Sequence, residues 1–172
     1  LYRYEKSTAY RTAPLEYRLS KQGMIITNEA DLGKGFLKQV KEEIENNDLL
    51  REALFPQSDK KWAETEITCK NGAGVMIKSF GSKMRGRHPG WIVLDDFMDD
   101  SVIYSDEQRK KFENVFQGVV SNLIMPHGQI INVGTPFTQK DLFSQLKTKK
   151  NWKVFEYPSI FPDGSMLWEE MH

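Results

Sequence analysis

Residues 91–96 join an apolar run to two adjacent carboxylates, Asp95 and Asp96. Four consecutive apolar residues predict a central parallel strand that is buried on both faces. An acid at the carboxyl end of such a strand lies in the crevice where open α/β sheets bind ligands. There, Asp95 can hold a magnesium ion against nucleotide phosphates, and Asp96 can activate a water molecule. The alternative interpretation is a buried strand that ends in an exposed acidic turn. Asp99 and Asp100 are expected to be solvated turn residues.

The pair Lys6-Ser7 has the Lys-Ser sequence of a phosphate-binding P-loop and is expected to open a helix. In that role Lys6 reaches the outer phosphates, and Ser7 joins Asp95 as a magnesium ligand. Glu5 stands where the P-loop pattern has its second glycine, and a carboxylate beside polyphosphate is repulsive unless it turns away. The alternative is an ordinary solvated helix cap.

A basic, glycine-rich loop over residues 81–90 directly precedes the apolar run. We interpret it as a flexible arm that presents a guanidinium group to phosphate, either in its own site or in that of a neighbour. The alternative is an exposed basic loop without a ligand. His88, next to Pro89, is expected to be structural.

The tripeptide Gly134-Thr135-Pro136 follows an apolar strand predicted over 129–133. We place that strand two positions along from the strand that ends at Asp95. In motor ATPases the polar residue at this place senses the nucleotide phosphate by hydrogen bonding and passes that state to the part that grips the substrate. Thr135 is the candidate for that role, and a tight turn is the alternative.

Helices alternate with apolar strands along the chain, which predicts a mostly parallel sheet with crossover helices. Asn28 is predicted to be the N-cap of the longest helix. Asn71-Gly72 predicts a hairpin turn within residues 62–80. The expected helices cover 6–19, 28–54, 105–125 and 141–147, and the other expected strands cover 24–27, 91–95, 129–133 and 152–157. The apolar face of the longest helix is predicted from Leu32, Phe36, Leu37, Val40, Ile44 and Leu49 or Leu50.

The chain of 172 residues is long enough for one well-buried domain, and a second domain is not expected. A formal net charge of +0 gives no global attraction to nucleic acid, so any DNA contact has to be local. A basic cluster follows the Gly-Thr-Pro tripeptide, for which we favour a solvated surface over a DNA contact. This cluster consists of Lys147, Lys149, Lys150 and Lys153.

A single cysteine, Cys69, excludes an internal disulfide and fits a reducing compartment. No apolar stretch reaches the length of a membrane span, and the amino terminus lacks a signal-peptide pattern. We therefore expect a soluble intracellular protein. A chain that begins at Leu1 is expected to be a fragment or a processed product.

The order of these motifs resembles the ATPase domain of the large terminase subunit, the motor that packages DNA into the heads of tailed bacteriophages. The resemblance runs nearly from end to end. Arg3-Tyr4-Glu5-Lys6-Ser7-Thr8 resembles the family's degenerate Walker A motif, residues 82–87 its Arg-Gly-x-Arg-type loop, and residues 92–96 its Walker B motif. Gly134-Thr135-Pro136-Phe137, followed by Asp141-Leu142-Phe143, resembles its coupling motif.

The resemblance implies an α/β fold of the P-loop NTPase-like (ASCE) type, with a mostly parallel sheet flanked by helices and a β-hairpin insertion. The ATPase domain would cover residues 1–160 and lack its first strand. Residues 161–172 would begin a linker toward an absent nuclease domain, so we expect no DNA cleavage by this chain.

The resemblance also implies ATP and Mg²⁺ as ligands, with hydrolysis coupled to DNA translocation. Asp95 and Ser7 would bind the metal, and Asp96 would activate water. An arginine ahead of Walker B can act in trans as a finger on the neighbour's ATP, with Arg85 as our first choice and Arg87 as the second. The nucleotide-binding set comprises Arg3, Lys6, Ser7, Thr8 and Thr135, and Arg3 alternatively supplies a charge in cis.

The implied partners are double-stranded DNA, a portal protein, a small terminase subunit and further copies of the chain in a ring, within the host cytoplasm. Two other hypotheses stay open. Glu5 favours a non-catalytic ATPase-like domain that binds a portal, DNA or another subunit. A helicase-type ATPase shares the strand order and a similar coupling motif, but it needs a second motor domain, for which this chain is too short.

Overall fold

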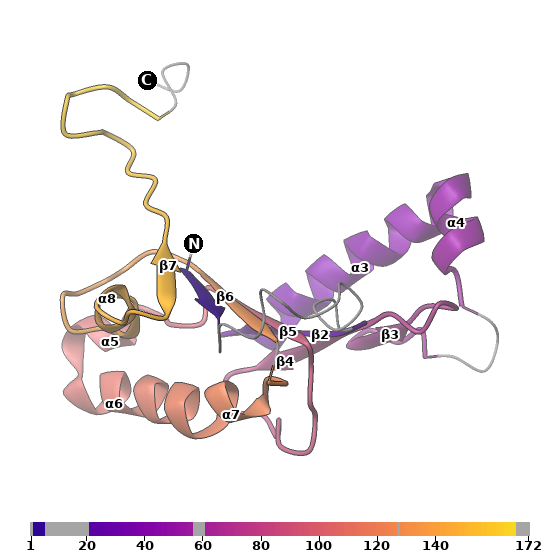
Figure 1. Ribbon diagram of the computed structural model, residues 1–172, viewed down its shortest axis with the longest axis horizontal. Helices are drawn as coiled ribbons and strands as arrows, with labels where there is room; N and C mark the ends of the chain where they lie inside the picture. The colour runs from indigo at the N-terminus through magenta and orange to yellow at the C-terminus, as the bar shows by residue number, and fades with distance from the viewer. Residues whose placement is uncertain (1, 6–20, 57–60, 127, 168–172) are drawn as a thin grey trace.

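The computed structural model describes residues 2–5, 21–56, 61–126 and 128–167 (Figure 1). The helix expected over 6–19 lies outside the described residues, as do the candidate site residues Lys6, Ser7 and Thr8.

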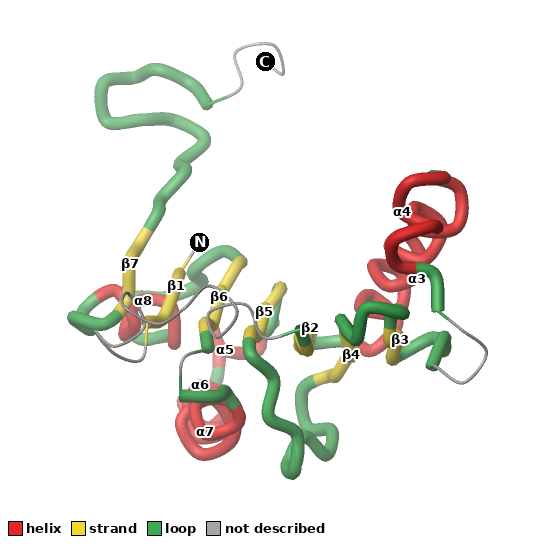
Figure 2. Tube along the Cα trace, turned by 45° about the vertical axis from the view of Figure 1, so that its right-hand side comes forward, coloured by secondary structure: helices red, strands yellow, loops and turns green. Residues whose placement is uncertain are grey.

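Seven strands form one sheet in the order β3-β4-β2-β5-β6-β1-β7, which can be followed from strand to strand in Figure 2. The four adjacent strands β4, β2, β5 and β6 are parallel, whereas β3 runs antiparallel to β4 and β1 runs antiparallel to both β6 and β7. The mostly parallel α/β sheet predicted from the alternation of helices and strands is therefore confirmed. The strands are β1 (Tyr2–Glu5), β2 (Gln22–Thr27), β3 (Glu66–Thr68), β4 (Gly74–Ser79), β5 (Trp91–Asp95), β6 (Gln129–Val133) and β7 (Trp152–Val154).

Helices cover both faces of the sheet: Figure 1 shows α6 and α7 on one side and α3 on the other. The larger core cluster joins one face of β2, β5 and β6 to α6, α7 and α8, and the smaller one joins β3 and β4 to α3. Because the side chains of a strand alternate between faces, Ile92 and Leu94 of β5 enter the larger core and are fully buried. The helices are α3 (Ala30–Asn46), α4 (Asp48–Leu54), α5 (Ser101–Tyr104), α6 (Asp106–Val115), a π-helical turn η1 (Phe116–Val120), α7 (Ser121–Leu123) and α8 (Leu142–Lys147).

Two features of the sheet correct the sequence interpretation. Strand β6 pairs directly with β5, with Val133 opposite Asp95, and does not lie two positions away. Residues 3–5, expected in a Walker-A-like segment, form β1 antiparallel to β6. Tyr2 and Tyr4 suit a strand, because aromatic residues are enriched there. Glu5 pairs with Gln129 at the amino end of β6, so β1 runs away from the end of the sheet where Asp95 lies.

The longest predicted helix is interrupted. Helix α3 ends at Asn46, and the side chain of Asn47 accepts hydrogen bonds from the N–H groups of Leu49 (3.1 Å) and Leu50 (3.2 Å), which starts α4. The predicted apolar face is also too wide. Leu37 and Ile44 are buried, whereas Leu32, Val40 and Leu49 are exposed.

The predicted helix after Ser105 is confirmed, and Ser105 caps α6 by accepting a hydrogen bond from the N–H of Gln108 at 3.3 Å. The predicted hairpin is confirmed in β3 and β4, with Gly72 at φ 82 in its turn. The hairpin is not an insertion, however, because β4 pairs in parallel with β2 and belongs to the central sheet.

Candidate functional site at the carboxyl edge of the sheet

The carboxyl ends of the four parallel strands bring Ser79, Thr27, Asp95 and Val133 into one row, which we call the carboxyl edge. Residues paired in register point to the same face of a sheet, so Asp95 lies beside Thr27. Thr27 is fully buried, and its hydroxyl donates a 2.6 Å hydrogen bond to the carbonyl oxygen of Glu29. That bond fixes the chain between β2 and α3. Asp95 therefore projects from a rigid part of the sheet.

Asp95 is only partly exposed to solvent. Burial raises the pKa of its carboxyl above the ordinary value, and the neighbouring charge of Asp96 raises that pKa further. Both effects make the carboxylate form less favourable in the folded chain. A cation at this position would relieve them, because opposite charge stabilises the ionised form.

Asp96 differs sharply from Asp95 in its backbone. It has φ 41, which is the left-handed region, and its side chain is exposed. Its N–H donates a 3.2 Å hydrogen bond to the carbonyl oxygen of Val133, which ties the end of β5 to the end of β6. Aspartate is among the few residues other than glycine that tolerate this backbone conformation.

Gly134 faces Asp96 directly across the carboxyl edge. A Cβ atom placed on Gly134 would lie 2.8 Å from Cζ of Phe143 and 3.4 Å from Oδ1 of Asp96. Gly134 also has φ 153, a backbone conformation that residues with side chains rarely adopt. Only glycine therefore allows the chain to pass between Phe143 and the Asp96 carboxylate.

The loop after Gly134 is held by a residue whose role the sequence interpretation did not identify. Asp141 is buried, and its carboxylate accepts hydrogen bonds from the N–H groups of Phe137 (2.7 Å), Thr138 (2.9 Å) and Ser144 (2.9 Å). It caps α8 and closes the loop at the same time. Thr135 is exposed and lies two residues before the first of these bonds. The signal available in the sequence was an aspartate directly before a helix.

Asp99 was expected to be a solvated turn residue, and this expectation is wrong. Its carboxylate accepts hydrogen bonds from Asn28 Nδ2 at 3.0 Å, from the N–H of Ser101 at 3.0 Å and from the Ser101 hydroxyl. The pKa of Asp99 is lowered chiefly by the Ser101 hydroxyl, with further lowering by the Ser101 N–H, Asn28 and the charge of Lys111. Asn28 serves as this cross-link between the chain after β2 and the chain after β5, and not as the predicted N-cap of α3.

The basic, glycine-rich loop over residues 81–90 lies away from Asp95 in this chain. It leaves the carboxyl end of β4 and returns to the amino end of β5, where the Gly90 N–H donates to the carbonyl oxygen of Gln22 at 2.8 Å. Arg87 forms a 3.6 Å ion pair with Glu66 at the start of β3. Arg85 is exposed and lines a hollow beside Val115 and Val119 of the α6–η1 helix.

Strand β6 also contains a buried polar side chain without a structural explanation. Asn132 is 1% exposed, and its Nδ2 and Oδ1 atoms have no hydrogen-bond partner among the described residues. It pairs with Leu94 of β5 and Tyr2 of β1. A buried amide without partners opposes folding.

The described residues fit a magnesium ion that is shared with a ligand, and not one held by protein groups alone. Among them, no three His, Cys, Asp or Glu side chains gather as a metal site. Asp95 and Asp96 nevertheless place two carboxylates at one strand end. Magnesium typically binds one or two carboxylates together with water and substrate phosphates. Arg3, expected to bind nucleotide, belongs to β1.

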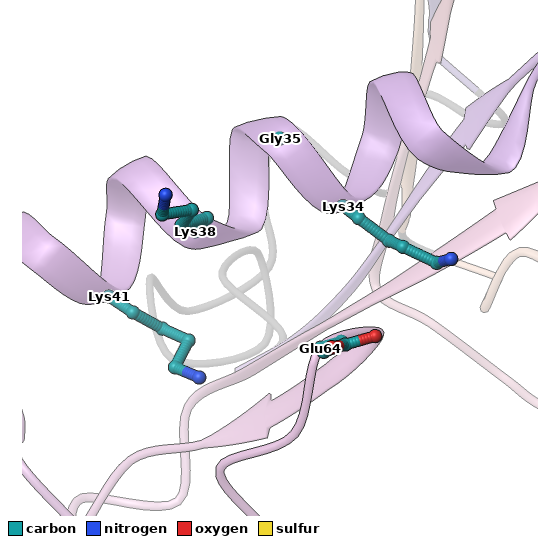
Figure 3. Close-up of a pocket in the computed structure, with 5 residues that line it drawn as sticks. All are labelled: Lys34, Gly35, Lys38, Lys41 and Glu64. Atoms are coloured by element: carbon teal, nitrogen blue, oxygen red, sulfur yellow. The ribbon is translucent and has the colours of Figure 1, made fainter.

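A separate pocket of about 490 Å³ lies between α3 and the chain before β3 (Figure 3). Three lysines and Glu64 line it. Lys34 already forms a 2.8 Å ion pair with Asp31, and Lys38 lies 3.7 Å from Glu42. Figure 3 shows Lys34 and Lys41 extending from the helix toward the side where Glu64 lies. Because acids surround these lysines, the pocket is a poor match for phosphates.

No model of a known protein family matches this chain, and no curated protein matches it. The fold and the site together define an α/β protein with a mostly parallel sheet flanked by helices and a carboxylate pair at the carboxyl edge. Within the described part of the chain, no helix is long and apolar enough to cross a membrane.

Proposed function

We propose that this chain is a magnesium-dependent ATPase domain of the type that drives double-stranded DNA into a viral capsid in large terminase subunits. One observation supports this most strongly: Asp95 and Asp96 end a buried parallel strand, directly beside the Gly134-Thr135-Pro136 loop of the next strand. This is the position where open α/β sheets bind ligands. The P-loop NTPase-like (ASCE) identity of the fold belongs to this proposal.

Three residues at or next to the carboxyl edge, Asp95, Asp96 and Thr135, then have separate roles. Asp95 would hold Mg²⁺, which would neutralise the charge of the outer phosphates. Asp96 orients the attacking water, and its left-handed backbone turns its carboxylate toward Gly134. The Thr135 hydroxyl contacts the terminal phosphate, and Asp141 keeps that loop in place. Ser7 remains a proposed metal ligand, and Arg3, Lys6 and Thr8 remain proposed phosphate contacts.

We further propose that copies of the chain form a ring on a portal protein, with a small terminase subunit as partner, in the host cytoplasm. The exposed position of Arg85 supports its role as a finger toward a neighbour's ATP. Arg87 is the second choice, because it would first have to leave Glu66.

The test measures ATP hydrolysis with magnesium and long duplex DNA in the presence of the portal partner. We expect Asp95→Asn and Asp96→Asn to lower the rate by at least about a hundredfold each. Asp100→Asn is the matched control, because Asp100 is an exposed acid on the same turn whose side chain makes no cap hydrogen bond. Equal rates in all three variants would refute the assigned roles, and strand separation without translocation would favour a helicase.

A second candidate function is a non-catalytic ATPase-like domain that binds a portal, DNA or another subunit. The observation that favours it is the antiparallel strand β1, because Arg3 and Glu5 belong to a strand between β6 and β7 and not to a phosphate-binding loop. Thermal unfolding distinguishes the two, since a ligand that binds only the native state raises the melting temperature. A shift with ATP and magnesium that Asp95→Asn abolishes supports the ATPase.

A further inference from the structure

A pocket of about 790 Å³ opens beside the carboxyl edge. One wall is the end of β6 with the Gly134-Thr135-Pro136 loop, and the other is the segment 155–159 that follows β7. Figure 1 shows this segment leaving the sheet after β7. The volume lies within the range of about 300–1,000 Å³ that is typical of small-molecule sites.

Aromatic and proline side chains dominate the wall formed by segment 155–159. Phe155 and Tyr157 supply two rings, and Pro158 also lines the pocket, as does Pro136 of the loop. Tyr157 is 67% exposed, so its ring is largely available to a ligand. Flat apolar surfaces of this kind suit a planar ring, which can stack on an aromatic side chain.

An ion pair between Glu156 and Lys147 links this wall to α8. Within the wall, Lys153 Nζ lies 4.9 Å from the centre of the Phe155 ring. The opposite wall leads directly into the residues that Asp141 binds through the N–H groups of Phe137 and Thr138. Each wall is therefore connected to α8 by polar contacts.

Gly134 links the pocket to the carboxylate pair. It lines the pocket, and a Cβ placed on it would be 3.4 Å from Asp96 Oδ1. A ligand with its charged end at Asp95 and Asp96 would thus extend past Gly134 into the aromatic part. A nucleotide has this division into an anionic end and a planar ring.

We propose that this pocket binds the base of the nucleotide, with Tyr157 stacked on it. The inference rests on the proposed ATPase function, because the phosphates have to lie at Asp95 and Asp96. Thr135 then contacts the phosphate side and Pro136 the base side of the same ligand, so one loop contacts both parts of the nucleotide. Stacking recognises any planar base, so Tyr157 adds affinity for nucleotides without strong selection among them.

The experiment compares the binding of ATP and of inorganic tripolyphosphate, each with magnesium, to the whole chain and its variants. Tyr157→Leu keeps an apolar side chain but removes the ring, and Tyr157→Phe keeps the ring. We expect Tyr157→Leu to weaken ATP binding about tenfold and Tyr157→Phe to leave it within about twofold, because aromatic stacking on a base has that size. Tripolyphosphate, which has no base, should bind all variants equally.

A fluorescent adenine analogue of ATP gives a spectroscopic readout, since stacking on a tyrosine or phenylalanine ring quenches it and a leucine does not. Tyr104→Leu is the matched control, because Tyr104 is 84% exposed and does not line the pocket. Because Tyr157 is exposed, its variants should fold normally, which circular dichroism checks.

Two failures are distinguishable. If ATP binding depends on Asp95 but is unchanged in Tyr157→Leu, the base lies elsewhere and the inference falls while the proposed function stands. Equal weakening of ATP and tripolyphosphate in Tyr157→Leu would also overturn it, since the ring would then act on the phosphates or on the fold. If the wild-type chain binds no ATP, both proposals fail.

Discussion

Asp95 and Asp96 are neighbours in the chain but have different physical properties. Asp95 ends a regular strand and has a raised pKa because of burial and the charge of Asp96. Asp96 is exposed and has a left-handed backbone. The two carboxylates therefore suit different tasks, one holding a cation at a fixed place and the other contacting a mobile water molecule.

The raised pKa of Asp95 makes a prediction about stability. A carboxyl whose pKa is raised in the folded chain lowers the free energy of unfolding at pH values above that pKa. This destabilisation disappears as the pH falls below the folded pKa toward the unfolded one. Asp95→Asn should therefore raise the free energy of unfolding near neutral pH in magnesium-free buffer while it removes ATP hydrolysis. Urea unfolding checks this. An unchanged or lower stability at neutral pH, with no convergence in acid, would contradict it.

Gly134 is predicted to tolerate no side chain. Gly134→Ala should lower the free energy of unfolding by about 1–3 kcal/mol, because the new methyl group meets Phe143 and the backbone becomes strained. The control is Gly35→Ala in α3, where a Cβ meets nothing within 4 Å. That exchange should stabilise the chain by roughly 0.5–1 kcal/mol through helix propensity. Equal effects of the two exchanges in urea unfolding would be inconsistent with the described close approach.

Sequence reasoning identifies residues whose type and immediate context already specify their place. Asp95 and Asp96 follow an obvious apolar strand, and Gly134 follows another. Asp99 was misjudged because its partners, Asn28 and Ser101, include a residue from a distant part of the chain. Such a contact depends on how β2 and β5 pair, which local patterns do not contain.

At the scale of elements, the ends of β2 and β5 are joined by Asp99 and not only by the sheet. Its hydrogen bonds from Asn28 and Ser101 couple the start of α3 to the start of α5. Because Asp99 is an acid, the strength of this connection should depend on pH.

Because the pKa of Asp99 is lowered in the folded chain, its contribution to stability is present above the unfolded value of about 3.9 and is lost as the pH falls through the lower folded value. Asp99→Asn should therefore be less stable than the wild type near neutral pH, and the difference should shrink in acid. Unfolding measured across the acid range checks this. A difference that stays constant with pH would show that the charge is unimportant.

The helix after Ser105 and the hairpin at Asn71-Gly72 were predicted correctly because caps and turns are local signals. The break between α3 and α4 was missed, although Asn47 is a good N-cap. The regular spacing of apolar residues across 32–50 predicted one continuous helix instead. The exposure of Leu32, Val40 and Leu49 shows that only part of that period faces the sheet.

For the whole molecule, the sheet order was the least predictable feature. The direct pairing of β5 with β6, and the antiparallel position of β1 beside β6, are contacts between segments far apart in the chain. No local pattern in residues 2–5 specifies a partner strand.

The proposed ring leads to a prediction about mixed assemblies. If Arg85 acts on a neighbour's site, Arg85→Ala and Asp95→Asn chains should each be inactive alone but regain about a quarter of the wild-type rate when mixed equally and assembled on the portal, because one interface type in four then has both groups. Arg87→Ala mixed with Asp95→Asn is the corresponding test of the second choice. No recovery in the first mixture would exclude Arg85 as a finger in trans.

The buried amide of Asn132 has a practical consequence for handling this protein. A side chain of the same branched shape without polar atoms would need no partners, so Asn132→Leu should raise the free energy of unfolding by about 1–3 kcal/mol. Thermal unfolding checks the gain, and an unchanged or lower melting temperature would indicate a hidden use for the amide. A parent chain with higher stability would allow destabilised variants to be purified and compared at one temperature.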